Sequence, residues 1–250
     1  MSYVKGLHSV GALLSDAPER VRVLLVQKNR RDTRMQNLIA MAKTGNVRCE
    51  FVDKRRLDRV GGEGHQGVVA DCHALSLATE ADLEDCYEAW GAQKLFLVLE
   101  HVSDPRNLGA SLRTAAAAGV NAVFVPKRRS APLNAAALKA AAGAAERLMI
   151  VEVVNLARRL EWLQRQGVWI VGAAPEATRS WTDVDMTRDV AIVVGSEGEG
   201  LRVLTKKLCD ETVTIPMAAA MDSLNVSVAT GVLLFEVVRQ RTAGKQSRAG

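Results

Sequence analysis

The sequence predicts an α/β protein with a small amino-terminal domain and a larger domain built around a parallel sheet. First, short apolar runs alternate with helical stretches along most of the 250 residues, and this alternation favours parallel strands with helices on both faces. Second, an acidic segment interrupts an otherwise basic chain and marks a boundary between two units. Third, 48% of the residues are apolar and 24% are charged, which is typical of a soluble globular protein with a real core.

The amino-terminal part of the chain shows the pattern of a small α/β unit. Apolar residues with a helical period predict helices, and short runs rich in β-branched residues predict strands. The expected helices cover 8–15 and 32–44, and the expected strands are 21–27, 47–52 and 67–72.

The boundary between the two units is visible in the charge distribution. Residues 1–75 carry 13 Lys/Arg against 8 Asp/Glu, residues 76–92 carry none against 5, and residues 93–250 carry 20 against 15. We therefore expect a domain at 1–75, an acidic linker at 76–92 with a short helix over 80–90, and a second domain at 93–242. Residues 243–250 are expected to form a flexible tail.

The second domain repeats the α/β rhythm over a longer span. Its strands are expected to be apolar along their whole length, as in sheets that are buried on both faces. The expected strands are 95–100, 121–126, 148–154, 168–174, 190–195 and 212–216, and the expected helices are 108–118, 134–145, 155–166, 201–208 and 225–240.

Composition excludes several classes of protein. No apolar stretch approaches the ~18 residues of a membrane span, and the start of the chain lacks the pattern of a signal peptide, so we expect a cytoplasmic protein. The four cysteines lie far apart without a C-x-x-C pair, so neither a metal site nor a disulfide framework is predicted. The net charge of +5 and the pI of about 9.2 favour a polyanionic partner.

Ligands of α/β proteins bind at the carboxyl ends of strands, and the first unusual strand end is followed by "NLGASLRTAAAAG", residues 107–119. Small residues fill this predicted helix and indicate a closely packed face. Arg113 interrupts them, and a guanidinium cannot be buried unpaired without a large cost. It therefore has to reach water, an acidic partner or a ligand.

The second strand end is followed by "VVGSEGEGLR", residues 193–202, whose glycines permit a close approach of backbone to a ligand. Their spacing matches neither the dinucleotide-binding nor the P-loop pattern. The third strand end lies in "TIPMAAAMDSLNVSVATG", residues 214–231. Asn225 and Ser227 can cap the helix that begins there, and the amides of the small apolar loop before it can frame a flat, adenine-like ring.

Together these three stretches resemble the signature motifs of the SpoU (TrmH-like) RNA ribose methyltransferases, which belong to the SPOUT superfamily. The order and the spacing also match, and the resemblance covers nearly the whole chain. "GLHSVGALL" (6–14), "HQGVVA" (65–70) and "VPKRRSAPLNAAALKAAAGAAE" are similar to the subgroup that methylates a guanosine of bacterial 23S rRNA.

The resemblance implies an L30e-like RNA-binding unit followed by an α/β domain whose carboxyl end forms a trefoil knot, a rare topology. It also implies a homodimer in which the arginine of the first motif is supplied by the partner subunit. S-adenosylmethionine would lie in the knot, and no metal is implied. The implied cofactor-binding residues are Gly195, Gly200, Ile215, Met217 and Leu224, and the implied catalytic residues are Asn107, Arg113, Glu197, Asn225 and Ser227.

The implied reaction moves a methyl group from a sulfonium to a ribose 2′-hydroxyl, so the site has to supply alignment and control of one proton. Alignment contributes about 7–11 kcal/mol, and positioned proton transfer contributes roughly 10²–10⁴-fold. Arg113 would act either as a general base or as a charged group that stabilises the developing alkoxide. Asn107 would orient Arg113 or the ribose, Glu197 and Asn225 would hold the loops, and Ser227 would donate to either substrate.

Three basic clusters are candidate phosphate contacts: "KNRRDTR" (28–34), "DKRRLDR" (53–59) and "PKRRS" (126–130). Two other readings compete with an rRNA methyltransferase: an RNA-binding protein that uses the same fold without catalysis, and a nicotinamide-dependent dehydrogenase, which the glycine spacing disfavours. Relatives with tRNA targets leave the choice of RNA open. The sequence also leaves open which nucleotide is methylated and whether the substrate is free rRNA or an assembly intermediate of the ribosome.

Overall fold

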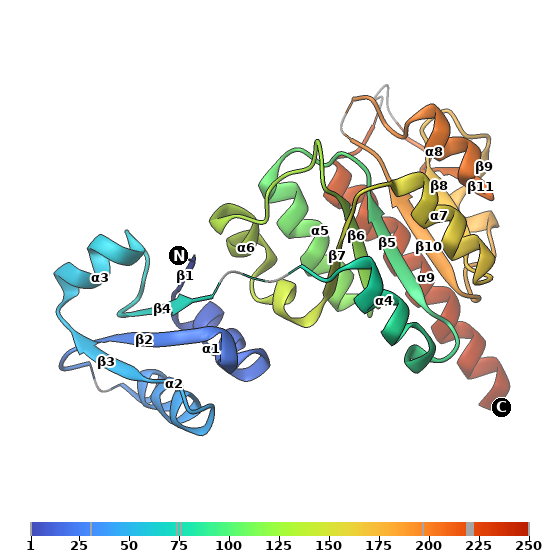
Figure 1. Cartoon of the computed structure of the whole chain (residues 1–250). Coiled ribbons are helices and arrows are strands. Elements are labelled where there is room, and N and C mark those ends of the chain that lie inside the picture. Colours follow the sequence, from blue (N-terminus) through green and yellow to red (C-terminus); the bar gives the residue numbers. More distant parts are fainter. Residues whose placement is uncertain are drawn as a thin grey trace.

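A computed structural model describes residues 2–30, 32–73, 75, 77–196, 198–218 and 223–249, except for the side chains of Ser2 and of residues 245–249. The described residues form two sheets (Figure 1). The smaller sheet has four strands in the order β1-β4-β2-β3, and the larger has seven in the order β7-β6-β5-β10-β8-β11-β9.

The smaller sheet is mixed. β4 is antiparallel to both β1 and β2, and β3 is parallel to β2. Val10, Leu24 and Met35 are buried between one face of the sheet and the helices α1 and α2. The elements of this unit are β1 (Ser2–Lys5), α1 (Leu7–Asp16), η1 (Pro18–Arg20), β2 (Val21–Gln27), α2 (Thr33–Thr44), β3 (Cys49–Val52), α3 (Lys54–Gly61) and β4 (Val68–Cys72).

The structure contains the strands and helices that periodicity predicts for this unit, together with two elements that it does not. Strand β1 has only four residues, which is too short for a periodic signal. Helix α3 has the sequence KRRLDRVG, and Leu57 is its one buried side chain. With eight residues, this helix is shorter than the stretch over which a helical period can be recognised in a sequence.

The segment predicted as an acidic linker packs against the larger sheet. Its helix α4 (Glu80–Tyr87) begins with a capping box and is followed by η2 (Glu88–Trp90). Leu83 and Tyr87 are buried in the core. Arg159, which is 4% exposed, forms ion pairs with Glu80 and Glu84. The acidic charge of this segment is thus matched by a buried arginine, which ties it to the larger unit.

The larger sheet confirms the predicted α/β class, because every pairing between its strands is parallel. The two-residue strand β9 is too short for the sequence to predict. The strands are β5 (Leu95–Leu99), β6 (Ala122–Pro126), β7 (Met149–Val153), β8 (Trp169–Ala173), β9 (Arg179–Ser180), β10 (Val190–Val194) and β11 (Glu211–Thr214). The helices are α5 (Pro105–Ala117), α6 (Ala135–Ala141), η3 (Ala144–Arg147), α7 (Leu156–Arg165), η4 (Trp181–Asp183), α8 (Val203–Leu208) and α9 (Val226–Ala249).

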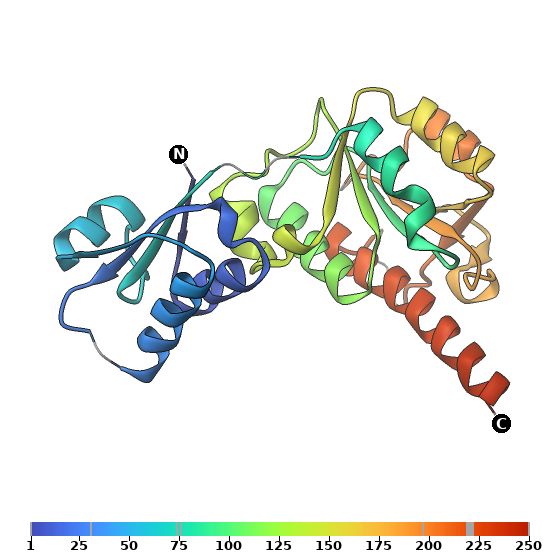
Figure 2. The same cartoon turned by 60° about the horizontal axis from the view of Figure 1, so that its bottom comes forward.

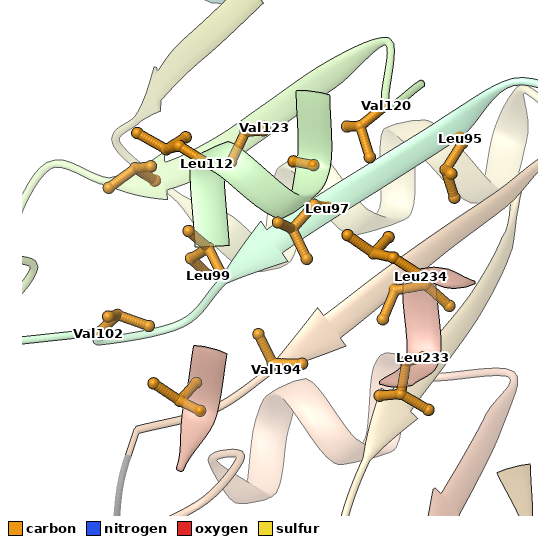
Figure 3. Packing of buried hydrophobic residues seen from close by; sticks show 14 of the residues in the cluster. Leu95, Leu97, Leu99, Val102, Leu112, Val120, Val123, Val194, Leu233 and Leu234 are labelled. Carbon is orange, nitrogen blue, oxygen red and sulfur yellow. The ribbon is translucent and has the colours of Figure 1, made fainter. Parts of the chain in front are cut away.

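Strand β5 shows why the strands of this sheet are apolar throughout. Leu97 and Leu99 point to the face that α5 and α9 cover, where Leu112 and Leu234 pack against the sheet (Figure 3). Phe96 and Val98 belong to the core cluster on the opposite face, which also contains side chains of α4 and α7. Successive side chains of a strand alternate between faces, so a strand buried on both sides needs apolar residues at every position.

The terminal helix is longer than the sequence predicts. A helix over 225–240 with a flexible tail at 243–250 is expected, but α9 continues to Ala249, while Gly250 lies outside the described residues. The side chain of Arg241 donates hydrogen bonds to four backbone carbonyls of the larger unit, which anchors the helix beyond residue 240. None of the helices in the described part of the chain has both the length and the apolarity to cross a membrane.

The small unit contacts the larger one where α1 meets η3 and where β1 meets α6 (Figure 2). Arg20 and Glu146 form an ion pair at 2.9 Å across this contact, and their side chains are only 11% and 5% exposed. A second pair joins Asp16 to Arg147 at 2.6 Å, and the arginine there is 57% exposed. The buried pair is therefore the stronger candidate for fixing the two units to each other.

We expect Arg20→Ala to release the small unit from the larger one. The substitution leaves the buried carboxylate of Glu146 without its cation, and breaking a buried pair in this way costs about 3–5 kcal/mol. Small-angle X-ray scattering should show an increased radius of gyration. The matched control is Arg147→Ala, which removes an exposed pair worth about 0–1 kcal/mol and should leave the scattering curve unchanged. Identical curves for both variants would contradict this role of Arg20.

Candidate active site

A cavity of about 700 Å³ opens at the carboxyl ends of β8, β10 and β11. Its volume lies within the range of small-molecule sites, roughly 300–1,000 Å³. The five residues that the sequence assigns to a cofactor all line it: Gly195, Gly200, Ile215, Met217 and Leu224. The cavity thus joins the second and third sequence motifs in one site.

The glycines of the second motif allow its loop to fold back on itself. A Cβ atom on Gly195 would lie 2.1 Å from the carbonyl carbon of Gly200 and 2.5 Å from the amide nitrogen of Leu201. Gly198 and Gly200 have φ angles of 91° and 64°, a conformation that favours glycine. The spacing of these glycines therefore follows from the way this loop folds back on itself. It differs from the glycine spacing of dinucleotide-binding loops and of P-loops.

The walls of the cavity are apolar, with few polar side chains. Val213, Ile215, Leu224 and Val226 provide apolar surface, while the backbone of the glycine loop provides amide and carbonyl groups. Such a site can hold a flat, uncharged ring by apolar contact and recognise its edge through backbone hydrogen bonds. The residues present therefore fit the adenosine part of S-adenosylmethionine.

A buried carboxylate that sequence reasoning missed holds the glycine loop in place. Glu100 is 2% exposed. Its Oε2 accepts a hydrogen bond from the backbone nitrogen of Arg202 at 3.0 Å, and its Oε1 accepts one from Oγ1 of Thr205 at 2.6 Å. The end of β5 is thereby joined to the loop that follows β10. The sequence signal that could have pointed to Glu100 is its position, as an acidic residue directly after a wholly apolar strand.

Three of the predicted catalytic residues meet beside the cavity. Nδ2 of Asn225 donates to Oδ1 of Asn107 at 3.0 Å, so the first and third motifs touch across 118 positions of sequence. Oδ1 of Asn225 accepts from the backbone nitrogen and the hydroxyl of Ser227 at 3.0 and 2.6 Å. Asn225 therefore caps the start of α9 and orients Asn107 at the same time.

Arg113 lies away from this group. It is exposed on α5, does not line the cavity, and forms no hydrogen bond or ion pair with any of the described residues. Six residues separate it from Asn107, which turns the two side chains about 120° apart on a helix. Gly109, one turn before Arg113, packs so closely on α6 that its Cβ would lie 2.2 Å from the carbonyl oxygen of Ala137. The small residues thus serve the packing of α5, while Arg113 faces outward.

Glu197, the remaining predicted catalytic residue, lies outside the described residues. Its role stays a prediction.

The cysteines are all free thiols, and burial raises the pKa of Cys209 to about 12 and that of Cys72 to about 11. The described residues contain no group of three or more His, Cys, Asp or Glu side chains placed to hold a metal ion.

We expect Asn225→Asp to separate capping from orientation. The aspartate keeps the oxygen that accepts from Ser227 but loses the amide that donates to Asn107. The methyl transfer that the motifs imply should fall by about two- to tenfold, in line with the loss of one positioned hydrogen bond of roughly 0.5–1.5 kcal/mol, and a new repulsion between oxygens adds to this loss. The melting temperature should stay close to that of the unaltered chain. Asn225→Ala is the comparison, since it also removes the cap and should lower stability by about 1 kcal/mol. Full activity of Asn225→Asp would contradict the orienting role.

Comparison with known proteins places the chain in one family. The family model described as "SpoU rRNA Methylase family" matches residues 94–235, and "RNA 2'-O ribose methyltransferase substrate binding" matches residues 3–78. Curated relatives named 23S rRNA (guanosine-2'-O-)-methyltransferase RlmB are 45% identical in Coxiella burnetii and 47% identical in Escherichia coli K12. These matches cover 97% and 96% of this chain, respectively, and 98% of each relative.

The solved structure of the SpoU methyltransferase AviRb from Streptomyces viridochromogenes shares the fold. The TM-score is 0.80 at 23% sequence identity, and the match covers 97% of this chain and 90% of that one. The sequence matches and the shared architecture together show that the chain belongs to the SpoU rRNA methylase family.

Proposed function

We propose that the chain transfers a methyl group from S-adenosylmethionine to the ribose 2′-hydroxyl of a guanosine in 23S rRNA. The observation that carries this proposal is the cavity, which lies beside the Asn107–Asn225 pair and is lined by the second and third motifs. The relatives named above are 23S rRNA (guanosine-2'-O-)-methyltransferases, and this chain matches 98% of the length of each of them.

We infer that the glycine loop and the residues around Ile215 and Leu224 would hold S-adenosylmethionine. When bound, this cofactor supplies a methyl group on a positively charged sulfur, which is already an activated leaving group. The chain therefore has to exclude water, align the ribose hydroxyl and manage its proton.

In this proposal Asn107, Asn225 and Ser227 position the ribose, since their amide and hydroxyl groups can both donate to and accept from a sugar hydroxyl. Arg113 remains a cation and stabilises the negative charge that develops on the hydroxyl oxygen. We assign it this role rather than that of a general base because a guanidinium keeps its proton at neutral pH. Glu197 would support the glycine loop.

We further propose that the chain acts as a homodimer in which Arg113 reaches the cavity of the partner subunit. Two features support this: Arg113 is exposed and does not line its own cavity, and α9 carries the apolar side chains of Val228 and Phe235, each 50% exposed. An exposed apolar stripe is typical of an interface. Phe235→Glu should therefore produce monomers in light-scattering measurements and lose most methyl transfer.

The remaining expectations belong to the same proposal. The L30e-like unit at 1–75 would bind the RNA, the unit at 93–242 would carry out methyl transfer, and the loop before α9 would take part in a trefoil knot. The site of action would be the cytoplasm.

The proposal is tested by mapping 2′-O-methyl groups in 23S rRNA from cells with and without this chain. The 2′-O-methyl group on one guanosine should be absent in cells that lack the chain, and it should return when the chain is supplied. Purified chain should transfer a tritiated methyl group to unmodified 23S rRNA. An unchanged map, together with no transfer in vitro, would reject the function.

A further inference from the structure

Three loops bring basic side chains together at the carboxyl edge of the larger sheet, beside the cavity. His101 follows β5, Arg129 follows β6, and Arg202 follows the glycine loop after β10. The strands β6, β5 and β10 are neighbours in the sheet and run parallel. Their carboxyl ends therefore meet at one edge, where Figure 1 shows the three loops gathered.

Hydrogen bonds hold these loops to one another. The backbone nitrogen of Ala131 donates to the carbonyl of Val102 at 2.7 Å, which joins the loop after β6 to the loop after β5. The backbone nitrogen of Glu100 donates to the carbonyl of Val194 at 2.9 Å, and its carboxylate accepts from the backbone nitrogen of Arg202. The three basic residues are thus carried on one connected framework.

Two of the three residues have a left-handed backbone conformation, which is uncommon for residues other than glycine. The φ angles are 56° at His101 and 61° at Arg129, in the left-handed region. Residues other than glycine seldom adopt this region, and they do so more often at functional sites than elsewhere. The two loops therefore turn sharply where their basic side chains are placed.

The arginines at this edge form no ion pair with a described carboxylate. Arg128, Arg129 and Arg202 are exposed, and none of them forms an ion pair with a described residue, whereas the neighbouring Lys127 pairs with Glu152 at 3.2 Å. Burial lowers the pKa of His101, and the charges of Arg202 and Arg129 lower it further, against opposing effects of Glu100 and Glu199. Both arginines are thus close enough to His101 to act on it.

We propose that His101, Arg129 and Arg202 form a binding site for a phosphodiester group of the RNA, next to the nucleotide whose ribose enters the cavity. Guanidinium groups match the geometry of phosphate oxygens, and a neutral imidazole offers one further N–H donor. Contacts to phosphates fix the position of a nucleic acid without reading its sequence. The site rests on the proposed function and would hold the strand in register with the cofactor cavity.

The first test uses the full-length double variant Arg129→Ala/Arg202→Ala with an unmodified 23S rRNA fragment. Its KM for RNA should rise about ten- to a hundredfold, consistent with the loss of charge-assisted hydrogen bonds. The slope of log affinity against log salt should become shallower by about one unit for each phosphate contact that is lost. The Kd for S-adenosylmethionine and the kcat at saturating RNA should change by less than about threefold, because the cavity is untouched.

The matched control is Arg165→Ala. Arg165 is also exposed and without an ion pair among the described residues, but it lies at the carboxyl end of α7, which leads to the opposite edge of the sheet. This variant should keep the KM and the salt slope of the unaltered chain. Equal effects of the control and the double variant would show a general loss of positive charge and would overturn the site.

The second test replaces single phosphates of the RNA near the target nucleotide with neutral methylphosphonates. At one position the replacement should weaken binding to the unaltered chain about tenfold and have little effect on the double variant, since the contact is already lost. If every methylphosphonate weakened RNA binding to the double variant as much as it weakened binding to the unaltered chain, the site would be overturned. The proposed function would stay intact. Failure of the unaltered chain to methylate any rRNA would overturn the proposed function and the site together.

Discussion

Replacing Arg113 by alanine should abolish most methyl transfer while leaving the fold and the affinity for S-adenosylmethionine intact. Arg113 is exposed on α5 and makes no contact with a described residue that stability would depend on. In the proposed mechanism it stabilises the charge developing on the ribose oxygen, and the loss of one such group costs about 10²–10³-fold in kcat. The measurement is single-turnover transfer of tritiated methyl to rRNA, accompanied by calorimetric titration with the cofactor.

The control for this prediction is Arg113→Lys, which keeps the charge but loses the planar, two-pronged geometry of arginine. It should recover part of the activity that alanine loses. A turnover of Arg113→Ala close to that of the unaltered chain would end the assignment of this residue.

The second large effect is expected from Gly195→Ala. The added methyl group would lie 2.1 Å from the backbone of Gly200, so the loop has to open rather than adjust a side chain. Forcing an extra methyl into a closely packed site costs about 1–3 kcal/mol, which corresponds to about five- to 150-fold in cofactor affinity. Calorimetric titration measures this loss directly.

A matched variant in the same loop separates steric contact from loop flexibility. At Gly198 an added Cβ would meet no atom within 4 Å, although its φ of +91° is unfavourable for alanine. Gly198→Ala should therefore weaken the cofactor less than Gly195→Ala does. Equal losses for the two variants would mean that the close approach of Gly195 to Gly200 is unimportant for binding.

The two variants with large effects can be combined to show which subunit supplies Arg113. Subunits carrying Arg113→Ala have an intact cavity, and subunits carrying Gly195→Ala have an intact arginine. If the arginine acts across the dimer, mixed dimers regain one working site, and random mixing restores up to about a quarter of the sites. If it acts within its own subunit, mixing at low cofactor concentration restores nothing.

Much of this fold is predictable because a sheet buried on both faces constrains its sequence strongly. The strands at 95–100 and 190–195 consist almost entirely of apolar residues, and the structure places them at the centre of the larger sheet. Elements that bury little could not be predicted this way. Helix α3 buries only Leu57, and the acidic residues of α4 resemble a solvated linker until their partner Arg159 is known.

The site likewise contains residues that the sequence could predict and residues that it could not. The glycine loop and the residues Ile215 and Leu224 could be assigned because their motif resemblance is specific, and the structure places them around one cavity. The role of Glu100 could not be predicted, since its partners Arg202 and Thr205 are more than 100 positions away. Helical geometry alone shows that Arg113 and Asn107 point in different directions, but it does not show where the arginine acts.

The buried pair between Arg20 and Glu146 sets a spacing within the molecule. Under the proposed function, the unit that binds one part of an RNA and the cavity that accepts one of its sugars are then held at a fixed distance from each other. An RNA in which the gripped element and the reacting sugar are separated differently would be held without being modified. Target choice would then depend on the three-dimensional shape of the RNA as well as on its bases.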